Sequence, residues 1–293
     1  GFFSQNGNGD MTGTHWLEES GFLDGPVLIT NTHSVGVVRD AFLAWLVNNK
    51  RRPGTNTFDG GFYTYPVVAE TWDGFLNDIN GFHVKPEHVF RALESASGES
   101  VAEGNVGGGT GMVCYGFKGG IGTSSRTAGP YKVGVLVQCN CGSRRQLRIG
   151  GMPVGAKLAE ALPPLASAGH PYREDTGSII IVVATDAPLL PHQTKRLARR
   201  ATMGLARTGS VSGNGSGDIF IAFSTANAKV AAAKSAVNVS MLPNDEINAV
   251  FEAAVQATEE AIVNAMVGAE TMRGNEGRTV YALPHDRVRA MFP

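Results

Sequence analysis

The sequence predicts an α+β fold in which helices cover stacked β-sheets. Apolar residues recur with strand and helix spacing along the whole chain, and the helical patterns come in blocks instead of one after each strand. That arrangement disfavours a single doubly wound sheet. No low-complexity linker divides the 293 residues, and one core is sufficient at this length, so we expect a single domain over residues 1–293.

The first half of the chain alternates short strands and helices. Residues 35–48 predict a helix, because the apolar residues lie on one face and the basic residues 50–52 suit its carboxyl end. Residues 86–95 predict another helix, since Pro86 followed by an acidic residue is typical of a helix start. Apolar runs predict strands at 26–30, 66–70, 111–117 and 131–138.

The second half contains the most apolar strand and the longest helix. The unbroken apolar run 179–184 predicts a buried strand, and residues 218–224 predict another strand. Residues 191–206, rich in Lys and Arg, predict a helix with a solvated face. The longest helix is expected over 243–267, where a polar residue can cap the start and an apolar stripe follows at helical spacing.

Composition excludes several classes of protein. Lys plus Arg number 25 and Asp plus Glu 26, so the formal net charge of -1 predicts no attraction to nucleic acid or to an anionic membrane. No apolar stretch reaches the roughly 20 residues that a membrane-spanning helix needs. Cys139 and Cys141 could form half of a metal site, but no second ligand pair accompanies them, so we expect no metal there. We do not expect an organic cofactor either.

The cysteines also bear on the cellular compartment. Cys114, Cys139 and Cys141 are too few for a disulfide framework, and their odd number suits a reducing compartment. The sequence begins at Gly1 and shows no signal-peptide pattern. We therefore expect a cytoplasmic protein, with the periplasm as the alternative if a segment before Gly1 carried an export signal.

Ser178 stands between Gly177 and the apolar run, so one backbone cleavage would leave a serine as the first residue of a buried strand. The free α-amine of that serine, with an ordinary pKa of roughly 8, could then act as the base for its own hydroxyl. Gly177 would allow the strained turn that such a cleavage needs. The alternative is a loop serine before an ordinary core strand, and the local pattern alone favours that interpretation.

Two glycine-rich segments, 105–111 and 209–217, could bring backbone N–H groups close to a ligand. Neither carries the Lys-Ser/Thr of a phosphate-binding loop, so tight turns that deliver side chains into a cleft are the better interpretation. The second segment leads into Ser216 and Asp218, which lie two positions apart at the start of a strand and therefore on one side. Such a pair could hold and polarise a nucleophile, although an Asp bonded to its own turn is the ordinary alternative.

Two other polar residues end predicted strands. Asn140 carries an amide that can donate to an oxyanion, although Asn is more common in turns. Glu70 could bind a substrate ammonium or be an ordinary solvated strand end. The seven histidines show no spacing that pairs one with a nucleophile, and no Gly-x-Ser-x-Gly elbow occurs, so a histidine-dependent hydrolase is the weaker alternative.

Eight segments from one end of the chain to the other form a specific set. They are NGNGDMTGTHW (6–16), ITNTHSVGVVRDA (29–41), VAETWDGFLND (68–78), GGGTGMVCYGFKGGIGTSSR (107–126), RRQLRIGG (144–151), GSIIIVVATDAPLLPHQ (177–193), SGNGSGDIFIAFSTAN (212–227) and VYALPHDR (280–287). Together they resemble the family of L-aminopeptidase/D-esterase-amidases and β-peptidyl aminopeptidases, self-cleaving serine peptidases of the N-terminal nucleophile type.

The resemblance implies an αββα sandwich of the N-terminal-nucleophile-hydrolase kind, with the topology that this family shares with the ornithine acetyltransferases. It implies autocleavage between Gly177 and Ser178 into residues 1–177 and 178–293, which stay together. Ser178 would then release N-terminal residues from small peptides, amino-acid amides or esters whose first residue is an L-residue, D-Ala or a β-amino acid. A homo-oligomer, a tetramer of cleaved units, is also expected.

The family's site residues fall on named positions of this chain. Ser216 and Asp218 match the Ser-x-acid pair that orients and activates the nucleophile. Asn140 matches the oxyanion donor, and Glu70 matches the acid that receives the substrate ammonium. Trp72 stands where relatives have a Tyr, so its indole N–H would donate from a different position.

Two other functions stay open at this point. An acyltransferase like the ornithine acetyltransferases is the first, and Ser178 in place of a Thr argues against it. An unprocessed, non-catalytic binding protein is the second. Family chains usually begin before the segment that matches Gly1, so we expect a further N-terminal portion, without which the chain could stay uncut.

Overall fold

The apolar run that follows Ser178 forms the central strand of a five-stranded sheet. β12 runs parallel to β13 and antiparallel to β9. Because β12 has a neighbour on each side and packed layers on both faces, Ile179, Ile180 and Ile181 are fully buried. The strand order is β1 (Phe2–Gly7), β13 (Gly217–Ser224), β12 (Ser178–Thr185), β9 (Tyr131–Asn140) and β8 (Gly120–Ala128).

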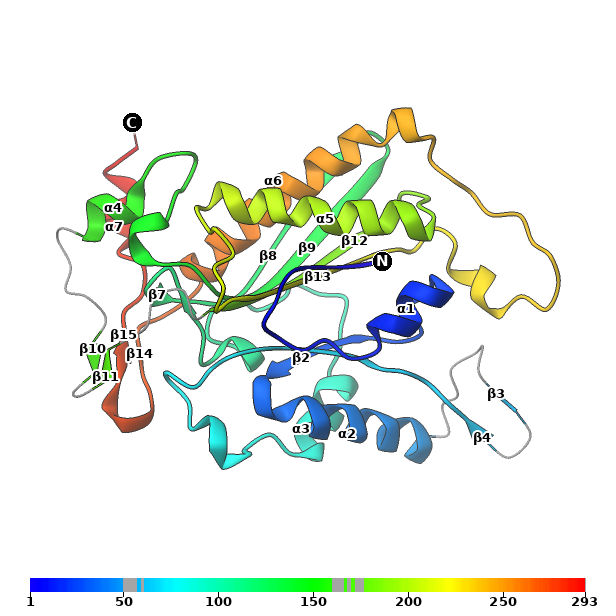
Figure 1. Cartoon of the computed structure of the whole chain (residues 1–293), viewed down its shortest axis with the longest axis horizontal. Coiled ribbons are helices and arrows are strands. Elements are labelled where there is room, and N and C mark those ends of the chain that lie inside the picture. The colour runs from blue at the N-terminus through cyan, green and yellow to red at the C-terminus, as the bar shows by residue number, and fades with distance from the viewer. Residues whose placement is uncertain (50–56, 59–60, 160–165, 168–169, 172–176, 293) are drawn as a thin grey trace.

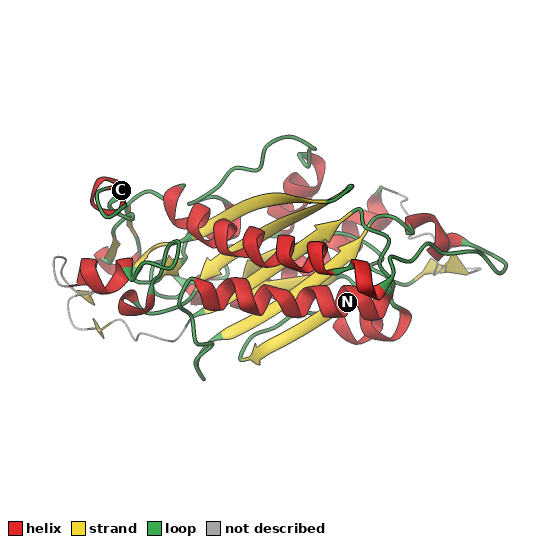
Figure 2. Ribbon diagram, turned by 90° about the horizontal axis from the view of Figure 1, so that it is seen from above, coloured by secondary structure: helices red, strands yellow, loops and turns green. Residues whose placement is uncertain are grey.

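Four layers are stacked in the order helix, sheet, sheet, helix (Figure 1). One face of the five-stranded sheet is covered by α5 (Pro191–Arg207) and α6 (Asn248–Val267), which Figure 2 shows lying over the strands. The other face meets the parallel pair β2 (Val27–Asn31) and β5 (Val67–Thr71). The far side of that pair is covered by α2 (Val35–Asn48) and α3 (Pro86–Glu94). The predicted αββα sandwich is confirmed.

The computed structural model describes residues 1–49, 57–58, 61–159, 166–167, 170–171 and 177–292. Within these ranges, no helix combines the length and the apolar character that crossing a membrane requires. The shorter helices and strands are α1 (Thr14–Ser20), β3 (Thr57–Phe58), β4 (Gly61–Phe62), β6 (Val113–Cys114), β7 (Phe117–Lys118), α4 (Val154–Ala159), β10 (Ala166–Ser167), β11 (His170–Pro171), β14 (Met272–Arg273), β15 (Thr279–Val280) and α7 (His285–Arg289). Short 3₁₀ turns lie at Thr32–Ser34, Ile79–Gly81, Gly107–Gly109, Arg144–Gln146, Ala228–Ala232, Asn244–Glu246 and Asn275–Gly277.

Side-chain alternation along β12 assigns each residue to one of two interfaces. Ile179 and Ile181 belong to the core beneath α5 and α6. Ile180 packs with Ala69 of β5 in the core between the two sheets. Ser178 is two residues before Ile180, so its side chain faces the second sheet.

Most predicted elements occur where the sequence places them, and two differ. The helix predicted over 35–48 matches α2, and the strand predicted over 179–184 matches β12 with one residue added at each end. The single strand predicted over 111–117 is wrong: this segment is the β6–β7 hairpin, because Tyr115 and Gly116 take left-handed backbone angles (φ 50° and 68°) and turn the chain. The helix predicted from 243 begins as a 3₁₀ turn, and α6 follows it.

Candidate active site

Ser178 lies at the start of β12, in the middle of the sheet, and is 2% exposed. Its register partners are Asn140 at the end of β9 and Gly217 at the start of β13. The main-chain N–H of Trp72, which directly follows β5, donates a hydrogen bond of 3.0 Å to Ser178 Oγ. The hydroxyl is therefore held between the two sheets by a donor from the second sheet.

The peptide bond before Ser178 is also fixed by neighbouring backbone. The carbonyl oxygen of Gly177 accepts a hydrogen bond of 3.1 Å from Gly217 N–H. A Cβ atom at Gly177 would lie 2.3 Å from the carbonyl oxygen of Asn140, so a larger residue would not fit there without backbone movement. The Gly177 carbonyl is thus buried and hydrogen-bonded next to the Ser178 hydroxyl.

Asn140 shares its face of the sheet with Ser178. Gln138, two residues earlier on β9, reaches Thr71 Oγ1 (2.6 Å) on β5, which shows that this face looks toward the second sheet. Asn140 Oδ1 accepts the N–H of Val113 at 2.7 Å. Because the amide oxygen is engaged there, the amide N–H₂ group of Asn140 points away from Val113 and is available as a donor.

Ser216 and Asp218 form a close pair, as the sequence predicts from their spacing. Ser216 Oγ donates a hydrogen bond of 2.6 Å to Asp218 Oδ1, and both residues are buried. Ile219 of β13 faces the second sheet, so alternation turns Asp218 toward the helix layer. The pair therefore lies on the face opposite the Ser178 hydroxyl and flanks Gly217, whose N–H binds the Gly177 carbonyl.

A residue that the sequence did not single out fixes the loop that carries Ser216. Asn6, in β1, donates from Nδ2 to the carbonyl oxygens of Ser216 (2.5 Å) and Gly213 (2.6 Å). Its position inside the segment NGNGD was the available signal. Asn6 thus connects the edge strand of the main sheet to the site.

Glu70 is the fourth residue of β5 and is only 3% exposed. Its Oε1 accepts the N–H of Asp10 at 2.9 Å, and its Oε2 accepts the hydroxyl of Thr32. Burial raises the pKa of Glu70 above its ordinary value, although these hydrogen bonds act in the opposite direction. Gly9 lies between the Glu70 carboxylate and the start of β13, because a Cβ there would be 3.1 Å from Glu70 Oε1 and 3.4 Å from the Cα of Gly217. The carboxylate is therefore near the end of β13 that pairs with Ser178.

Trp72 contributes its backbone at this site. Its side chain is 37% exposed and lies over Gly74, where a Cβ would be 2.9 Å from the indole nitrogen. The N–H group in contact with Ser178 Oγ is the main-chain N–H of Trp72 and not the indole N–H considered from the sequence. The contact therefore does not require a particular side chain at this position.

Histidines do not enter the hydrogen bonds described above. In the part of the chain that the structure describes, His83 pairs with Asp78 and His88 accepts the N–H of Lys85. Neither contact involves Ser178. This arrangement gives no support to a histidine-dependent hydrolase.

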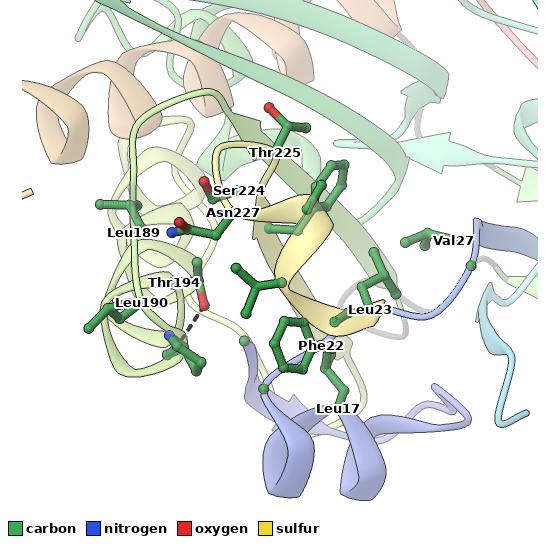
Figure 3. Close-up of a pocket in the computed structure, with 18 of the residues that line it drawn as sticks. Leu17, Phe22, Leu23, Val27, Leu189, Leu190, Thr194, Ser224, Thr225 and Asn227 are labelled. Atoms are coloured by element: carbon green, nitrogen blue, oxygen red, sulfur yellow. Dashed lines mark hydrogen bonds between the residues drawn. The ribbon is translucent and has the colours of Figure 1, made fainter. Parts of the chain in front are cut away.

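Two cavities lie near the strands that carry the site. One of about 570 Å³ is lined by Asn31 and Asp73, the residue after Trp72, and by apolar side chains of β2, α2 and α3. The other, of about 520 Å³, lies at the far end of β12 and β13, where Leu17, Leu23 and Val27 line it (Figure 3). Of the two, the first adjoins the residues that surround Ser178.

Comparison with known proteins finds relatives along nearly the whole chain. Residues 1–280 match peptidase family S58. Beta-peptidyl aminopeptidase BapA of Sphingosinicella microcystinivorans is 54% identical over 304 residues, which cover 100% of this chain and 75% of the relative.

Solved structures of similar proteins have the same fold. A β-aminopeptidase of Burkholderia sp. matches with a TM-score of 0.88 and 47% identity, over 99% of this chain and 79% of that chain. The L-aminopeptidase D-Ala-esterase/amidase of Ochrobactrum anthropi matches with a TM-score of 0.86 and 45% identity, over 99% and 78% of the two chains. The latter is described as a new variant of the Ntn hydrolase fold and as a prototype of the serine aminopeptidases.

The buried carboxylate of Glu70 leads to a prediction about stability. Because burial raises the pKa of Glu70 in the folded protein, the folded state binds this proton more tightly than the unfolded state. Such a group stabilises the fold fully below its unfolded pKa, and the contribution is lost as the pH rises through the folded pKa. Glu70→Gln is therefore expected to raise the urea midpoint of unfolding at neutral pH, since the amide keeps an acceptor for Asp10 N–H and carries no charge.

Urea titrations from about pH 4 to about pH 8 would measure this effect. The difference between Glu70→Gln and the wild type should be small at the acid end and grow toward neutral pH. Glu94→Gln, at an exposed carboxylate, is the matched control and should follow the wild type throughout. A Glu70→Gln protein that becomes less stable than the wild type as the pH rises would contradict the prediction.

Proposed function

Because the chain belongs to peptidase family S58 and is a serine aminopeptidase, we propose that it makes its own nucleophile by cleaving the bond between Gly177 and Ser178. The proposal rests on one arrangement: Ser178 Oγ is held by Trp72 N–H at 3.0 Å, while the adjacent Gly177 carbonyl oxygen is held by Gly217 N–H at 3.1 Å. Nucleophile and electrophile are thus neighbours, and each is bound by a fixed backbone donor.

The self-cleavage can be written as an acyl shift followed by hydrolysis. Ser178 Oγ adds to the carbonyl carbon of Gly177, the C–N bond breaks, and the hydroxyl proton ends on the nitrogen that becomes the α-amine. One water then hydrolyses the ester, which leaves a carboxylate on Gly177 and restores the hydroxyl of Ser178. Gly217 N–H stands where negative charge develops on the carbonyl oxygen and would stabilise it.

In the mature enzyme, the α-amine of Ser178 acts as the base for its own hydroxyl. As Ser178 Oγ attacks the carbonyl carbon of the substrate, the α-amine accepts the hydroxyl proton and becomes an ammonium. This ammonium then gives the proton to the leaving amine or alcohol, and an acyl-enzyme remains on Ser178 until water hydrolyses it. The oxyanion would be bound by the Asn140 side-chain amide and by Trp72 N–H, because both donors lie on the face that the hydroxyl occupies.

Ser216 and Asp218 are assigned to the amine and not to the hydroxyl. They flank Gly217, which binds the Gly177 carbonyl before cleavage, so the new α-amine would form at the start of β12 beside the start of β13. A carboxylate that polarises a hydroxyl can orient this amine and stabilise its protonated form during the reaction. The pair would thus still help to activate Ser178, as the family resemblance implies, but through the α-amine, because it lies on the face of β13 opposite the Ser178 hydroxyl.

Glu70 supplies the recognition of the substrate's free amine. A buried carboxylate held by Asp10 N–H and Thr32 is an oriented counter-charge for an ammonium group. We take peptides and amides that begin with a β-amino acid as the first substrate class to test, since two of the relatives are named β-peptidyl aminopeptidase or β-aminopeptidase. Amides of L-residues and esters or amides of D-Ala follow from the third relative.

The two cleavage products are expected to stay together as one domain. β12 begins the second product, residues 178–293, yet it pairs along its whole length with β9 of the first product, residues 1–177. We also infer a homo-oligomer, because several large apolar side chains are exposed: Tyr63, Tyr65, Val237, Val239 and Met241. The family resemblance implies a tetramer of cleaved units. The cytoplasm remains the predicted compartment, with the periplasm as the alternative.

The proposed recognition of the substrate's free amine by Glu70 is tested by removing the charge of that amine. β-Alanyl p-nitroanilide and its N-acetyl derivative differ in that group, and the acetylated compound should be hydrolysed at least about 10²-fold less efficiently. The reason is that leaving the buried Glu70 carboxylate without a charged partner costs about 2–5 kcal/mol of binding free energy. Glu70→Gln should raise KM for the compound with the free amine and leave kcat/KM for the acetylated compound unchanged. Equal kcat/KM values for both compounds in the wild type would contradict the proposal.

The oxyanion donors give a second test, measured as kcat on fully cleaved protein. Asn140→Ala should lower kcat by about 10²–10³ with little change in KM, because the lost donor acts on the transition state. Trp72→Phe keeps the main-chain N–H and is the matched variant, for which a much smaller loss is expected. If Trp72→Phe lost as much as Asn140→Ala, the indole would be the donor and the backbone assignment would fail.

A further inference from the structure

Three thiols meet in the core beside the oxyanion residue. Cys114 lies in β6, Cys139 in β9 and Cys141 just after β9. All three are fully buried, and their sulfur atoms lie within 4.8 Å of one another. The sequence predicted no site here, because Cys114 is 25 residues from Cys139 and shows no ligand spacing to it.

The three sulfur atoms are not equally spaced. The Cys114 and Cys139 sulfurs are 2.6 Å apart, and the Cys139 and Cys141 sulfurs are 3.7 Å apart. Non-bonded heavy atoms pack at about 3.5–4.0 Å, so the first pair is in closer contact than two separate thiols would be. Three thiolates around one zinc ion, each at about 2.3 Å from the metal, would stand nearly equally far apart at about 4 Å. The arrangement favours a pair plus a single thiol over a metal site.

We propose that Cys114 and Cys139 are a cross-linking site, joined by a disulfide bond that ties the β6–β7 hairpin to the end of β9. The pairing is supported by backbone contacts on either side of the sulfurs. Val113 N–H donates to Asn140 Oδ1, and Tyr115 N–H donates to the carbonyl oxygen of Cys141 at 2.7 Å. These contacts hold Cys114 beside the segment 139–141 independently of the sulfur atoms, and the shorter sulfur separation selects Cys139 as its partner.

A glycine allows the hairpin to approach this closely. A Cβ on Gly119 would lie 2.4 Å from the carbonyl oxygen of Cys139 and 2.8 Å from the Cβ of Cys114. Any side chain there would push the hairpin away from β9 and separate the two sulfurs. The β6–β7 hairpin therefore lies directly against the strand that ends in Asn140.

The cross-link has a consequence for the site, and this part rests on the proposed function. It joins the two segments, 113–114 and 139–140, whose hydrogen bond orients the Asn140 amide. Holding Val113 N–H against Asn140 Oδ1 keeps the amide N–H₂ group directed toward the oxyanion. Cys114 and Cys139 are thus positioning residues, acting through Asn140.

The bond forms by exchange with a disulfide compound such as oxidised glutathione. One cysteine thiolate attacks it and releases one reduced glutathione, and the second thiolate attacks the mixed disulfide and releases the other. Two thiols are oxidised, and one glutathione disulfide is reduced to two thiols. Because the three cysteines are fully buried, the exchange takes place before the hairpin closes during folding. Cys141 keeps its thiol, and the pair favours the periplasmic alternative for the compartment.

The number of free thiols is measured by mass spectrometry of the whole protein, cleaved or uncleaved. Protein secreted to a bacterial periplasm and protein made in the cytoplasm are denatured without reductant, alkylated with iodoacetamide and weighed. We expect one adduct on the secreted protein, at Cys141, and three adducts on the cytoplasmic protein or after reduction. All three cysteines lie in residues 1–177, so the count is the same whether or not the chain cleaves itself, and it is independent of activity.

Single variants identify the pair. Cys141→Ala should still form the cross-link and show no adduct before reduction, whereas Cys139→Ala should show two adducts. Three adducts on the secreted wild type, or a link that requires Cys141, would overturn the proposal. Three adducts together with a metal ion in the native mass would assign the cluster to a metal instead.

The positioning role is read from kinetics of the wild type alone. The cross-linked form should have a kcat several-fold higher than the reduced form at unchanged KM, because small displacements of a catalytic donor reduce the rate. Equal kcat values for the two forms would remove the positioning role even if the cross-link forms. Loss of activity in both forms would count against the proposed function and leave the thiol count unaffected.

Discussion

The site depends on the register of β12 between β9 and β13. That register places Ser178 beside Asn140 and Gly217 and directs its hydroxyl to the space between the sheets. A shift by one residue would turn Ser178 into the helix-covered core and bring Ile179 to the site. Both faces of the strand pack against apolar cores, so the cost of such a shift is the loss of the Trp72 N–H contact and the burial of an unpaired Ser178 hydroxyl. The hydrogen bonds of Ser178 Oγ and of the Gly177 carbonyl, which exist only in this register, therefore fix the position of the proposed nucleophile.

Close backbone packing completes the site around that register. A Cβ on Gly217 would lie 2.3 Å from the carbonyl oxygen of Asn8, so the segment that follows β1 lies against the start of β13. The same segment brings Asp10 N–H to the Glu70 carboxylate. The N-terminal loop therefore lies between Glu70 of β5 and the start of β13, and the backbone N–H groups of Asp10 and Gly217 make hydrogen bonds there.

The sequence predicts the elements that have a strong local apolar pattern, and it does not predict the contacts between residues far apart in the chain. The β12 strand and the α2 helix have strong apolar patterns and were predicted almost to the residue. The β8 edge strand, GIGTSSRTA, is small and polar and carries no such pattern. The local pattern at Ser178 was ambiguous, and family resemblance decided its interpretation. The Trp72 N–H contact joins residues 106 apart through a backbone group, which no residue type marks, and the face on which Asp218 lies follows from the register of β13.

Self-cleavage at Ser178 is the central claim, because the proposed base, the nucleophile and the amine-binding role of Ser216 and Asp218 all require a free α-amine there. The most direct measurement is the intact mass of the denatured protein beside that of the Ser178→Ala variant. The account predicts two polypeptides in the wild type, residues 1–177 and 178–293, and one uncut chain in the variant. A single uncut wild-type chain, or a variant cut at the same bond, would contradict it.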